Sequence, residues 1–261
     1  MAHETESLMA MQAPSLNDEE LLRYSRQIFL KQWDLEGQDN AKKAHVLIIG
    51  AGGLGCPAAL YLAGAGIGKL TLVDDDVVEI SNLHRQIAYR ESDVGLPKVK
   101  ALKQQLQRLN HNVKIDTFQQ RVDEAWLLDF LDTSIHLVLD CTDNFSIRSA
   151  LNRACQRKKI PLVSGAAIRY QGQVALYDFT RAEQACAVCL YGEGEMPDAY
   201  CHEAGILGPV VGLMGTQQAL LALQWLQGIS RLNQLYVLDA QRLIWRQLSA
   251  KKDSQCPVCS Q

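Results

Sequence analysis

An apolar run that ends in a glycine-rich turn constrains this chain more than any other feature. Residues 45–49 are apolar, the turn Gly50-Ala51-Gly52-Gly53-Leu54-Gly55 follows, and residues 56–63 have a helical composition. A strand, a glycine loop and a helix in this order form a phosphate-binding unit, because loop N–H groups and the helix N-terminus face the anion. Asp74 stands where an acid would bind a ribose hydroxyl. The pattern predicts a bound nucleotide and leaves NAD and ATP both open.

The size and charge of the chain narrow the function classes. Its 261 residues are enough for one large α/β domain, and its net charge is -3 at pH 7. Proteins that bind nucleic acids usually present a basic face, so this charge argues against a nucleic-acid partner. The first residues are polar and acidic and lack the apolar stretch of a signal peptide, which favours a cytoplasmic protein. We expect residues 1–16 to form a flexible tail.

One segment, residues 205–226, is apolar enough to require a membrane test. It contains Gln217, Gln218 and Gln224, and amide side chains are costly in the hydrocarbon core of a bilayer. The segment is therefore predicted to be a buried core helix, with no membrane association.

Strand-like and helix-like segments alternate through the first two thirds of the chain. Such alternation is typical of a Rossmann-like, mostly parallel sheet with helices on both faces. Asn17 is expected to cap the first helix, and Pro97 is expected at a first helical position. The strands are expected at 45–49, 70–74, 113–118, 135–140 and 160–163, and the helices at 18–31, 54–65, 97–109, 123–131 and 144–157.

The pattern changes after residue 165. Residues 173–179 alternate as a strand does, residues 191–199 have the composition of a mobile loop, and the long apolar helix follows. Two strand-like runs at 234–238 and 243–248 are expected to extend the same sheet in an antiparallel manner. The sequence therefore predicts one domain over 17–261, with a nucleotide-binding half at 17–165 and a second half at 166–261.

Two polar loops are expected at the same edge of the sheet as the glycine turn. Ser81-Asn82-Leu83-His84-Arg85-Gln86 could bring Arg85 to bound phosphates, although a surface turn with a solvated arginine fits the spacing equally well. Asp140-Cys141-Thr142-Asp143-Asn144 follows a central strand, where open parallel sheets bind ligands. Asp143 could hold Mg²⁺ between phosphate oxygens, and Asp143 or Asn144 could also cap the following helix.

The chain has eight cysteines without a secretory signal, which favours free thiols or metal ligands over disulfides. Cys186 and Cys189 form one C-x-x-C pair, and Cys256 and Cys259 form a second near the end of the chain. Four thiolates complete a tetrahedral zinc shell and leave no open position, so the prediction is a structural zinc site. A disulfide or redox role is the weaker alternative.

Cys201 is a separate candidate. It lies beside His202 between the expected mobile loop and the apolar helix, and an exposed thiol next to a histidine can be nucleophilic. A loop cysteine without a chemical role fits the sequence at least as well.

Taken together, these motifs resemble the bacterial adenylyltransferases that activate ubiquitin-like sulfur-carrier proteins. The resemblance covers residues 18–261, and the molybdopterin-synthase branch fits best, with the thiamine branch second. The motifs that carry it, besides the two cysteine pairs, are Arg23-Tyr24-Ser25-Arg26-Gln27, Gly50-Ala51-Gly52-Gly53-Leu54-Gly55, Ser81-Asn82-Leu83-His84-Arg85-Gln86, Gly95-Leu96-Pro97-Lys98, Asp140-Cys141-Thr142-Asp143-Asn144 and Pro161-Leu162-Val163-Ser164-Gly165-Ala166-Ala167.

The resemblance implies ATP with Mg²⁺ as the nucleotide, and a homodimer with two ATP sites. Arg26 matches a family position that reaches across the dimer interface, Asp143 matches the Mg²⁺ ligand, and Cys201 matches a cysteine that some relatives bond to the carrier or its sulfur. The remaining implied nucleotide contacts and catalytic groups are Gly50, Gly52, Gly53, Asp74, Ser81, Asn82, Leu83, His84, Arg85, Lys98 and Asn144.

The implied reaction is attack of the carrier's C-terminal glycine carboxylate on the α-phosphorus of ATP, with loss of pyrophosphate. The expected carrier is the molybdopterin synthase small subunit, and the alternative is the thiamine-pathway carrier. Sulfur is expected from a separate donor protein, because the larger relatives append a sulfurtransferase domain. An NAD-dependent oxidoreductase and a non-catalytic zinc scaffold that binds a ubiquitin-like partner are the competing interpretations from other classes.

Overall fold

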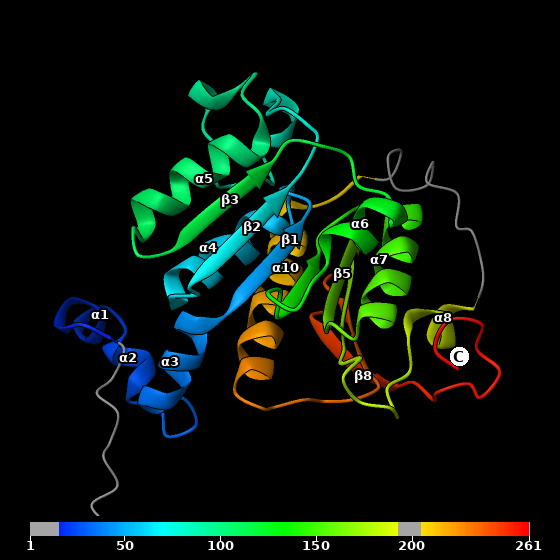
Figure 1. Ribbon diagram of the computed structural model, residues 1–261. Coiled ribbons are helices and arrows are strands. Elements are labelled where there is room, and N and C mark those ends of the chain that lie inside the picture. Colours follow the sequence, from blue (N-terminus) through cyan, green and yellow to red (C-terminus); the bar gives the residue numbers. More distant parts are fainter. Residues whose placement is uncertain (1–15, 193–204, 261) are drawn as a thin grey trace, which may run out of the picture.

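The structure is a computed structural model that describes residues 16–192 and 205–260 of the chain. A single eight-stranded sheet in the order β3-β2-β1-β4-β5-β6-β7-β8 forms its centre (Figure 1). The strands are β1 (His45–Ile49), β2 (Lys69–Val73), β3 (Lys114–Phe118), β4 (Leu137–Asp140), β5 (Leu162–Ile168), β6 (Gln171–Tyr177), β7 (Gln234–Asp239) and β8 (Ile244–Ser249).

The sheet has a parallel and an antiparallel part. The first five strands in spatial order, β3 to β5, pair in parallel, whereas β6, β7 and β8 follow in antiparallel pairs. The predicted mixed sheet and its antiparallel extension are therefore confirmed. Strand β5 continues to Ile168, beyond the expected end at residue 163, because it pairs along its whole length with β6.

Helices cover both faces of the sheet, as expected. Apolar side chains of α4, α5 and α10 pack against one face, and those of α6 and α7 pack against the other. Successive strand residues alternate between these layers: Val46 and Ile48 face the first, and Leu47 and Ile49 face the second. The helices are α1 (Asp18–Arg23), α2 (Ser25–Ile28), α3 (Asp34–Lys43), α4 (Gly55–Ala65), α5 (Lys98–Leu109), α6 (Glu124–Phe130), α7 (Phe145–Lys158), α8 (Ala187–Tyr191) and α10 (Gly208–Leu226), with 3-10 turns η1 (Ile80–Asn82) and η2 (Glu91–Asp93).

The N-terminal region differs from the expected single helix at 18–31. Asn17 does cap α1, in a reciprocal arrangement with Glu20, but the helix ends before Tyr24 and α2 begins after it. The Tyr24 side chain is buried, and its hydroxyl accepts a hydrogen bond from Asn110, so the chain bends to place this residue in the core. Leu16, at the end of the expected tail, is also buried.

Two further differences concern α3 and α5. Helix α3 was not expected, because its buried residues are Gly37, Gln38 and Ala41, which give no apolar periodicity. Pro97 precedes α5 as its cap instead of occupying the first helical position, which Lys98 takes.

The apolar segment after residue 205 forms α10, which packs against α4, β5 and β6 as a core helix. Its buried Gln218 donates hydrogen bonds to the carbonyl groups of Asp140 and Val163, so this amide joins the helix to two strands. None of the described helices has the combination of length and apolar character that crossing a bilayer requires.

Candidate functional site

The glycine loop, residues 50–55, lies at the carboxyl ends of the parallel strands, between β1 and β4, where the order of the strands in the sheet reverses. We call this end of the sheet, with the loops that follow β1, β2 and β4, the crevice. It follows β1, and the loop after the neighbouring strand β4 begins at Cys141. Gly50 has a φ of 96°, and a Cβ atom there would lie 2.6 Å from the carbonyl oxygen of Cys141. The two predicted loops are thus in contact, and only glycine fits at this point. Open α/β sheets bind ligands at such a reversal of strand order.

Three backbone N–H groups of the glycine loop have no acceptor among the described residues. Within the described chain, those of Gly52, Gly53 and Leu54 donate to no acceptor, although Gly53 and Leu54 are buried. Unpaired buried N–H groups are rare, and here they precede the N-terminus of α4, whose dipole is positive at that end. The arrangement has the donors of an anion-binding loop, as the sequence predicts.

The loop that begins at Ser81 lies beside the glycine loop. A Cβ atom at Gly53 would be 3.5 Å from Cγ of Arg85, so these two residues are neighbours, as expected. The guanidinium of Arg85 donates to the Ser81 carbonyl at 3.1 Å and also contacts the His84 ring. Asn82 is buried and accepts a bond from the Glu79 backbone, which makes it a support of the loop. Leu83 packs partly against the core, whereas Ser81 and His84 are exposed.

Asp74, Asp76 and Lys98 form a charged group at the end of β2. The carboxylate of Asp74 accepts from the backbone N–H of Ala51 at 2.7 Å, so it anchors the glycine loop, a contact that the sequence reasoning missed. Burial raises the pKa of the Asp74 carboxyl, and the charge of Lys98 opposes this effect. The Nζ atom of Lys98, whose side chain is buried, lies 2.6 Å from Asp76.

The loop after β4 carries Asp143 and Asn144. Asp143 is exposed. The side chain of Asn144 accepts from the backbone N–H of Ile147, so the cap expected at one of these two positions is Asn144. Asp140 is buried, so Asp143 is the residue among 140–144 whose carboxylate is open to solvent.

A buried ion pair holds the same loop in place. The fully buried carboxylate of Asp140 accepts from Arg148 at 3.0 Å and from Ser164 at 2.6 Å, and Arg148 also donates to the carbonyl groups of Thr142 and Gly165. Arg148 was not selected from the sequence. The pattern that could have indicated it is a charged residue four positions after Asn144, the cap of α7. Gln86, also unselected, is buried beside Gly52 with an amide oxygen that has no partner among described residues.

Arg26 lies far from the crevice, so the structure does not bring it together with the other candidates. It is an exposed residue of α2, and its neighbour Gln27 donates to the carbonyl of Ala65 at the C-terminal end of α4. Because α4 begins at the glycine loop, this contact places α2 at the opposite, amino-terminal edge of the sheet (Figure 1).

The four predicted zinc ligands lie together where α8 meets the C-terminal segment. Their sulfur atoms all lie within 4.8 Å of one another, and the cross-pair distances are 3.5 Å for Cys186–Cys256 and 3.4 Å for Cys189–Cys259. Disulfide sulfur atoms would be about 2.0 Å apart, so no disulfide is present in this cluster. Cys201 lies outside the described residues.

The sequence of this chain is similar to known proteins over nearly its whole length. Residues 24–258 match the ThiF family. The chain is 43% identical to the sulfur carrier protein ThiS adenylyltransferase of Escherichia coli K12, over 94% of this chain and 97% of that protein. It is 41% identical to the molybdopterin-synthase adenylyltransferase of Salmonella typhimurium, over 94% of this chain and 99% of that protein.

The chain is also similar to longer proteins and to solved structures. The adenylyltransferase and sulfurtransferase MOCS3 of Aedes aegypti is 40% identical, and the match covers 94% of this chain but 56% of that protein. The structure of E. coli MccB with ATP has a TM-score of 0.80 at 23% identity, covering 95% of this chain and 76% of that one. This likeness shows a shared fold.

Proposed function

Since the chain belongs to the ThiF family, we propose that it is a nucleotidyltransferase that adenylates the C-terminal carboxylate of a ubiquitin-like sulfur-carrier protein. The carrier is joined to AMP as an acyl-adenylate, and pyrophosphate leaves. The observation that carries this proposal is the crevice, where unpaired N–H groups of the glycine loop meet Arg85 and the loop of Asp143. The loop N–H groups alone would also suit the diphosphate of NAD. Arg85, Lys98 and the exposed carboxylate of Asp143 favour a triphosphate with Mg²⁺ instead.

The nucleotide would occupy the crevice with its phosphates on the glycine loop. Gly50 permits the close turn, and the N–H groups of Gly52 and Gly53 would donate to phosphate oxygens. Asp74 would bind the ribose, as the acid after the second strand does in related folds. Asn82 supports the neighbouring loop, in which Ser81, Leu83 and His84 would border the nucleotide.

Positive charge is the main catalytic requirement, because a carboxylate must approach a triphosphate. Arg85 is beside Gly53, and Lys98 is available if Asp76 releases it to a phosphate. Asp143 would hold Mg²⁺, which would neutralise phosphate charge when bound, and Asn144 keeps that loop attached to α7. Charged donors fixed before the reaction lower a barrier by several kcal/mol in total, of order 3–4 kcal/mol for one donor.

No protein nucleophile is needed, since the attacking carboxylate is already ionised. Cys56, the cysteine nearest the glycine loop in the sequence, is an inert thiol because burial raises its pKa to about 12. Cys201 keeps its proposed covalent role in sulfur transfer, and the Cys201→Ala variant tests it. Thiocarboxylate formation at the wild-type rate in that variant would exclude the role.

A second copy of the chain would complete each ATP site. Arg26 lies at the opposite edge of the sheet from the crevice of its own chain, so the proposed contact with ATP requires a homodimer. Mixed dimers of Arg26→Ala and Asp143→Asn chains test this. One of the two sites in each mixed dimer then contains both intact residues, so activity should return on mixing. Two inactive variants that stay inactive when mixed would exclude a shared site.

We also propose that the cysteine cluster binds one structural Zn²⁺. Zinc–sulfur bonds of about 2.3 Å in a tetrahedron place the sulfur atoms about 3.8 Å apart. The distances of 4.0 Å for Cys186–Cys189, 3.5 Å for Cys186–Cys256 and 3.4 Å for Cys189–Cys259 fit this value. The ion would join α8 to the C-terminal segment, and the free thiols of the described cysteines suit a reducing, cytoplasmic location.

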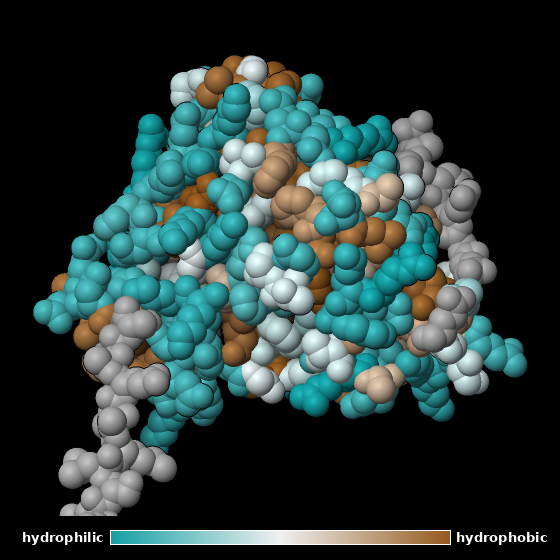
Figure 2. All heavy atoms as spheres, viewed as in Figure 1, coloured by the Kyte–Doolittle hydropathy of each residue, from teal (hydrophilic) through white to brown (hydrophobic). Residues whose placement is uncertain are grey.

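The half of the domain after residue 165 would receive the carrier. None of the described helices covers β8, whose residues are all exposed, and Leu248 of this strand is paired with Leu235 of β7 on the face that carries α7. Figure 2 shows the side of the molecule that carries α6 and α7, where polar side chains surround an apolar area in the region of these two helices. An uncovered apolar sheet face suits docking of a folded partner.

The molybdopterin synthase small subunit is the first proposed carrier, and the thiamine-pathway carrier is the second candidate because the ThiS enzyme is 43% identical. A separate protein is the proposed sulfur donor. ATP–pyrophosphate exchange with each carrier separately tests the proposal. Exchange with only one carrier identifies the pathway. If the protein binds ATP but shows no exchange with either carrier, it does not adenylate these carriers.

A further inference from the structure

Tyr89 is a buried residue of the segment between η1 and η2 whose hydroxyl reaches the glycine loop. The side chain is 4% exposed, and its hydroxyl donates to the carbonyl oxygen of Ala51 at 2.6 Å. The same hydroxyl lies 3.4 Å from the carbonyl of Lys98, the first residue of α5. One phenol therefore contacts the backbone at two places that the proposed function assigns to phosphate binding.

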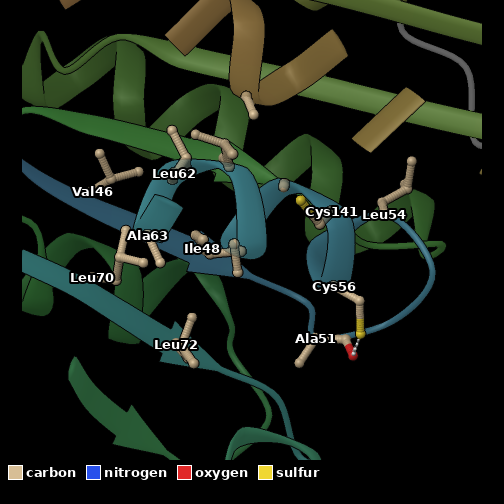
Figure 3. Close-up of a cluster of buried hydrophobic side chains, with 14 of the residues drawn as sticks. Val46, Ile48, Ala51, Leu54, Cys56, Leu62, Ala63, Leu70, Leu72 and Cys141 are labelled. Atoms are coloured by element: carbon tan, nitrogen blue, oxygen red, sulfur yellow. Dashed lines mark hydrogen bonds between the residues drawn. The ribbon is translucent and has the colours of Figure 1, made fainter. Parts of the chain in front are cut away.

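A second side chain, that of Cys56, also contacts the carbonyl oxygen of Ala51. The thiol of Cys56 lies 3.4 Å from this oxygen, as the dashed line in Figure 3 shows, and the N–H of Ala51 donates to Asp74. Burial raises the pKa of the Tyr89 phenol far above its ordinary value, so the hydroxyl keeps its proton and donates. The orientation of Ala51 is thus fixed by three side chains.

The direction of the Ala51 carbonyl decides the direction of the next N–H group. In a planar trans peptide the C=O and the following N–H point in opposite directions. With the Ala51 oxygen bonded to Tyr89 in the interior, the N–H of Gly52 points away from the interior, and it donates to no acceptor in the described chain. If the peptide were reversed, an electronegative oxygen would face the phosphates instead.

We propose that Tyr89 is a positioning residue for ATP: its hydroxyl holds the Ala51 carbonyl inward, so that the N–H of Gly52 is presented to a phosphate, and links this loop to the start of the helix that carries Lys98. The assignment rests on the proposed function, because it requires that the glycine loop binds the phosphates of ATP.

The Tyr89→Phe variant removes the hydroxyl and keeps the ring. The dissociation constant for ATP, measured by calorimetry without carrier, should rise about three- to tenfold, as expected for one neutral hydrogen bond. The KM for ATP in pyrophosphate exchange should rise by a similar factor, whereas the KM for the carrier should not change.

Thr71→Val is the matched control. It also removes a buried hydroxyl, one that lies 2.8 Å from His45 within the sheet and has no contact with the glycine loop. It should lower the melting temperature without weakening ATP binding. An unchanged ATP dissociation constant in Tyr89→Phe, or an equal change in Thr71→Val, would overturn the assignment.

Amide exchange in the unaltered chain tests the same geometry if Tyr89→Phe does not fold. Exchange of the Gly52 N–H should slow when ATP is added, and unchanged exchange with ATP bound would overturn the assignment. The affinity of the wild type reports on the proposed function, whereas the ratio of variant to wild type reports on Tyr89 alone. A wild-type protein that binds no ATP would overturn both.

Discussion

The glycine-loop crevice and the cysteine cluster bring polar groups together in opposite ways. In the crevice, three N–H groups have no partner within the described chain, the guanidinium of Arg85 hydrogen-bonds to Ser81 of its own loop, and Asp143 is exposed. In the cluster, four sulfur atoms from two distant segments lie close together, and three of the four cysteines are buried. An open set of donors suits a ligand that comes and goes, whereas a closed tetrahedron suits an ion that stays. A substitution that disrupts one of these regions should therefore leave ligand binding in the other unchanged.

The largest effect should follow removal of the metal from the cluster. Wild-type protein should contain about one zinc per chain by elemental analysis, and Cys256→Ala should lose it and lose the docked C-terminal segment. Structural zinc contributes on the order of 10 kcal/mol to folding of the unit it holds. ATP binding, measured by calorimetry, should remain because the hydrogen bonds described for the four cysteines do not reach the glycine loop.

Cys155→Ala is the matched control, since Cys155 is a buried cysteine of α7 outside the cluster. It should keep its zinc. Loss of ATP affinity on zinc removal would show that the cysteine cluster and the crevice are coupled.

The next largest effect should come from the ion pair beneath the crevice. Arg148→Met leaves the fully buried Asp140 without its cation, and breaking one side of such a pair costs about 3–5 kcal/mol. Urea unfolding should show this loss, and exchange activity should fall with it because Arg148 holds the Thr142 carbonyl. Arg153→Met, which breaks the exposed pair with Glu124, should cost less than about 1 kcal/mol. Equal losses in the two variants would contradict the structural role.

Arg85→Ala should lower the activity without changing the stability of the fold. ATP–pyrophosphate exchange should fall about 10²–10³-fold, which corresponds to roughly 3–4 kcal/mol of barrier, and the melting temperature should stay the same. Arg108→Ala, at an exposed position near the end of α5, should leave both unchanged. A decrease of less than about threefold for Arg85→Ala would mean that this arginine is a solvated surface residue.

The smallest effect should be a pH dependence that arises far from both regions. Burial lowers the pKa of His45, and the charge of Lys69 adds to this, so the folded chain binds a proton here less readily than the unfolded chain. Stability from this group is therefore present above a pH of about 6.5 and decreases as the pH falls below that value. Urea unfolding of wild type and His45→Gln at pH 7.5 and 5.5 measures it, and an equal loss in both proteins would contradict the assignment.

Periodicity and loop composition predicted most of the sheet and its helices, because strands with two buried faces and amphipathic helices have strong patterns. Helix α3 was missed because Gln38 and Gly37 occupy its buried side. The break at Tyr24 depends on a tertiary contact with Asn110, and no local signal shows such a contact.

The residues of the candidate site were accessible to sequence reasoning where a motif contained them, as with Gly53, Arg85 and the cysteine pairs. Residues that act through the backbone were not. Arg148 and Tyr89 bond to carbonyl groups, and any residue offers a carbonyl, so no spacing in the sequence identifies the partner. The position of Arg26 at the other edge of the sheet likewise follows only from the packing of α2 against α4.

The most direct test of adenylation is the intact mass of the carrier. Purified protein, ATP and Mg²⁺ should be incubated with the molybdopterin-type carrier and, separately, with the thiamine-type carrier, and each should be compared with a form that lacks its C-terminal glycine. We expect one intact carrier to gain the mass of an adenylyl group, its truncated form to stay unchanged, and Arg85→Ala to slow the gain. Carriers of unchanged mass, together with ATP bound in the crevice, would contradict adenylation of these carriers.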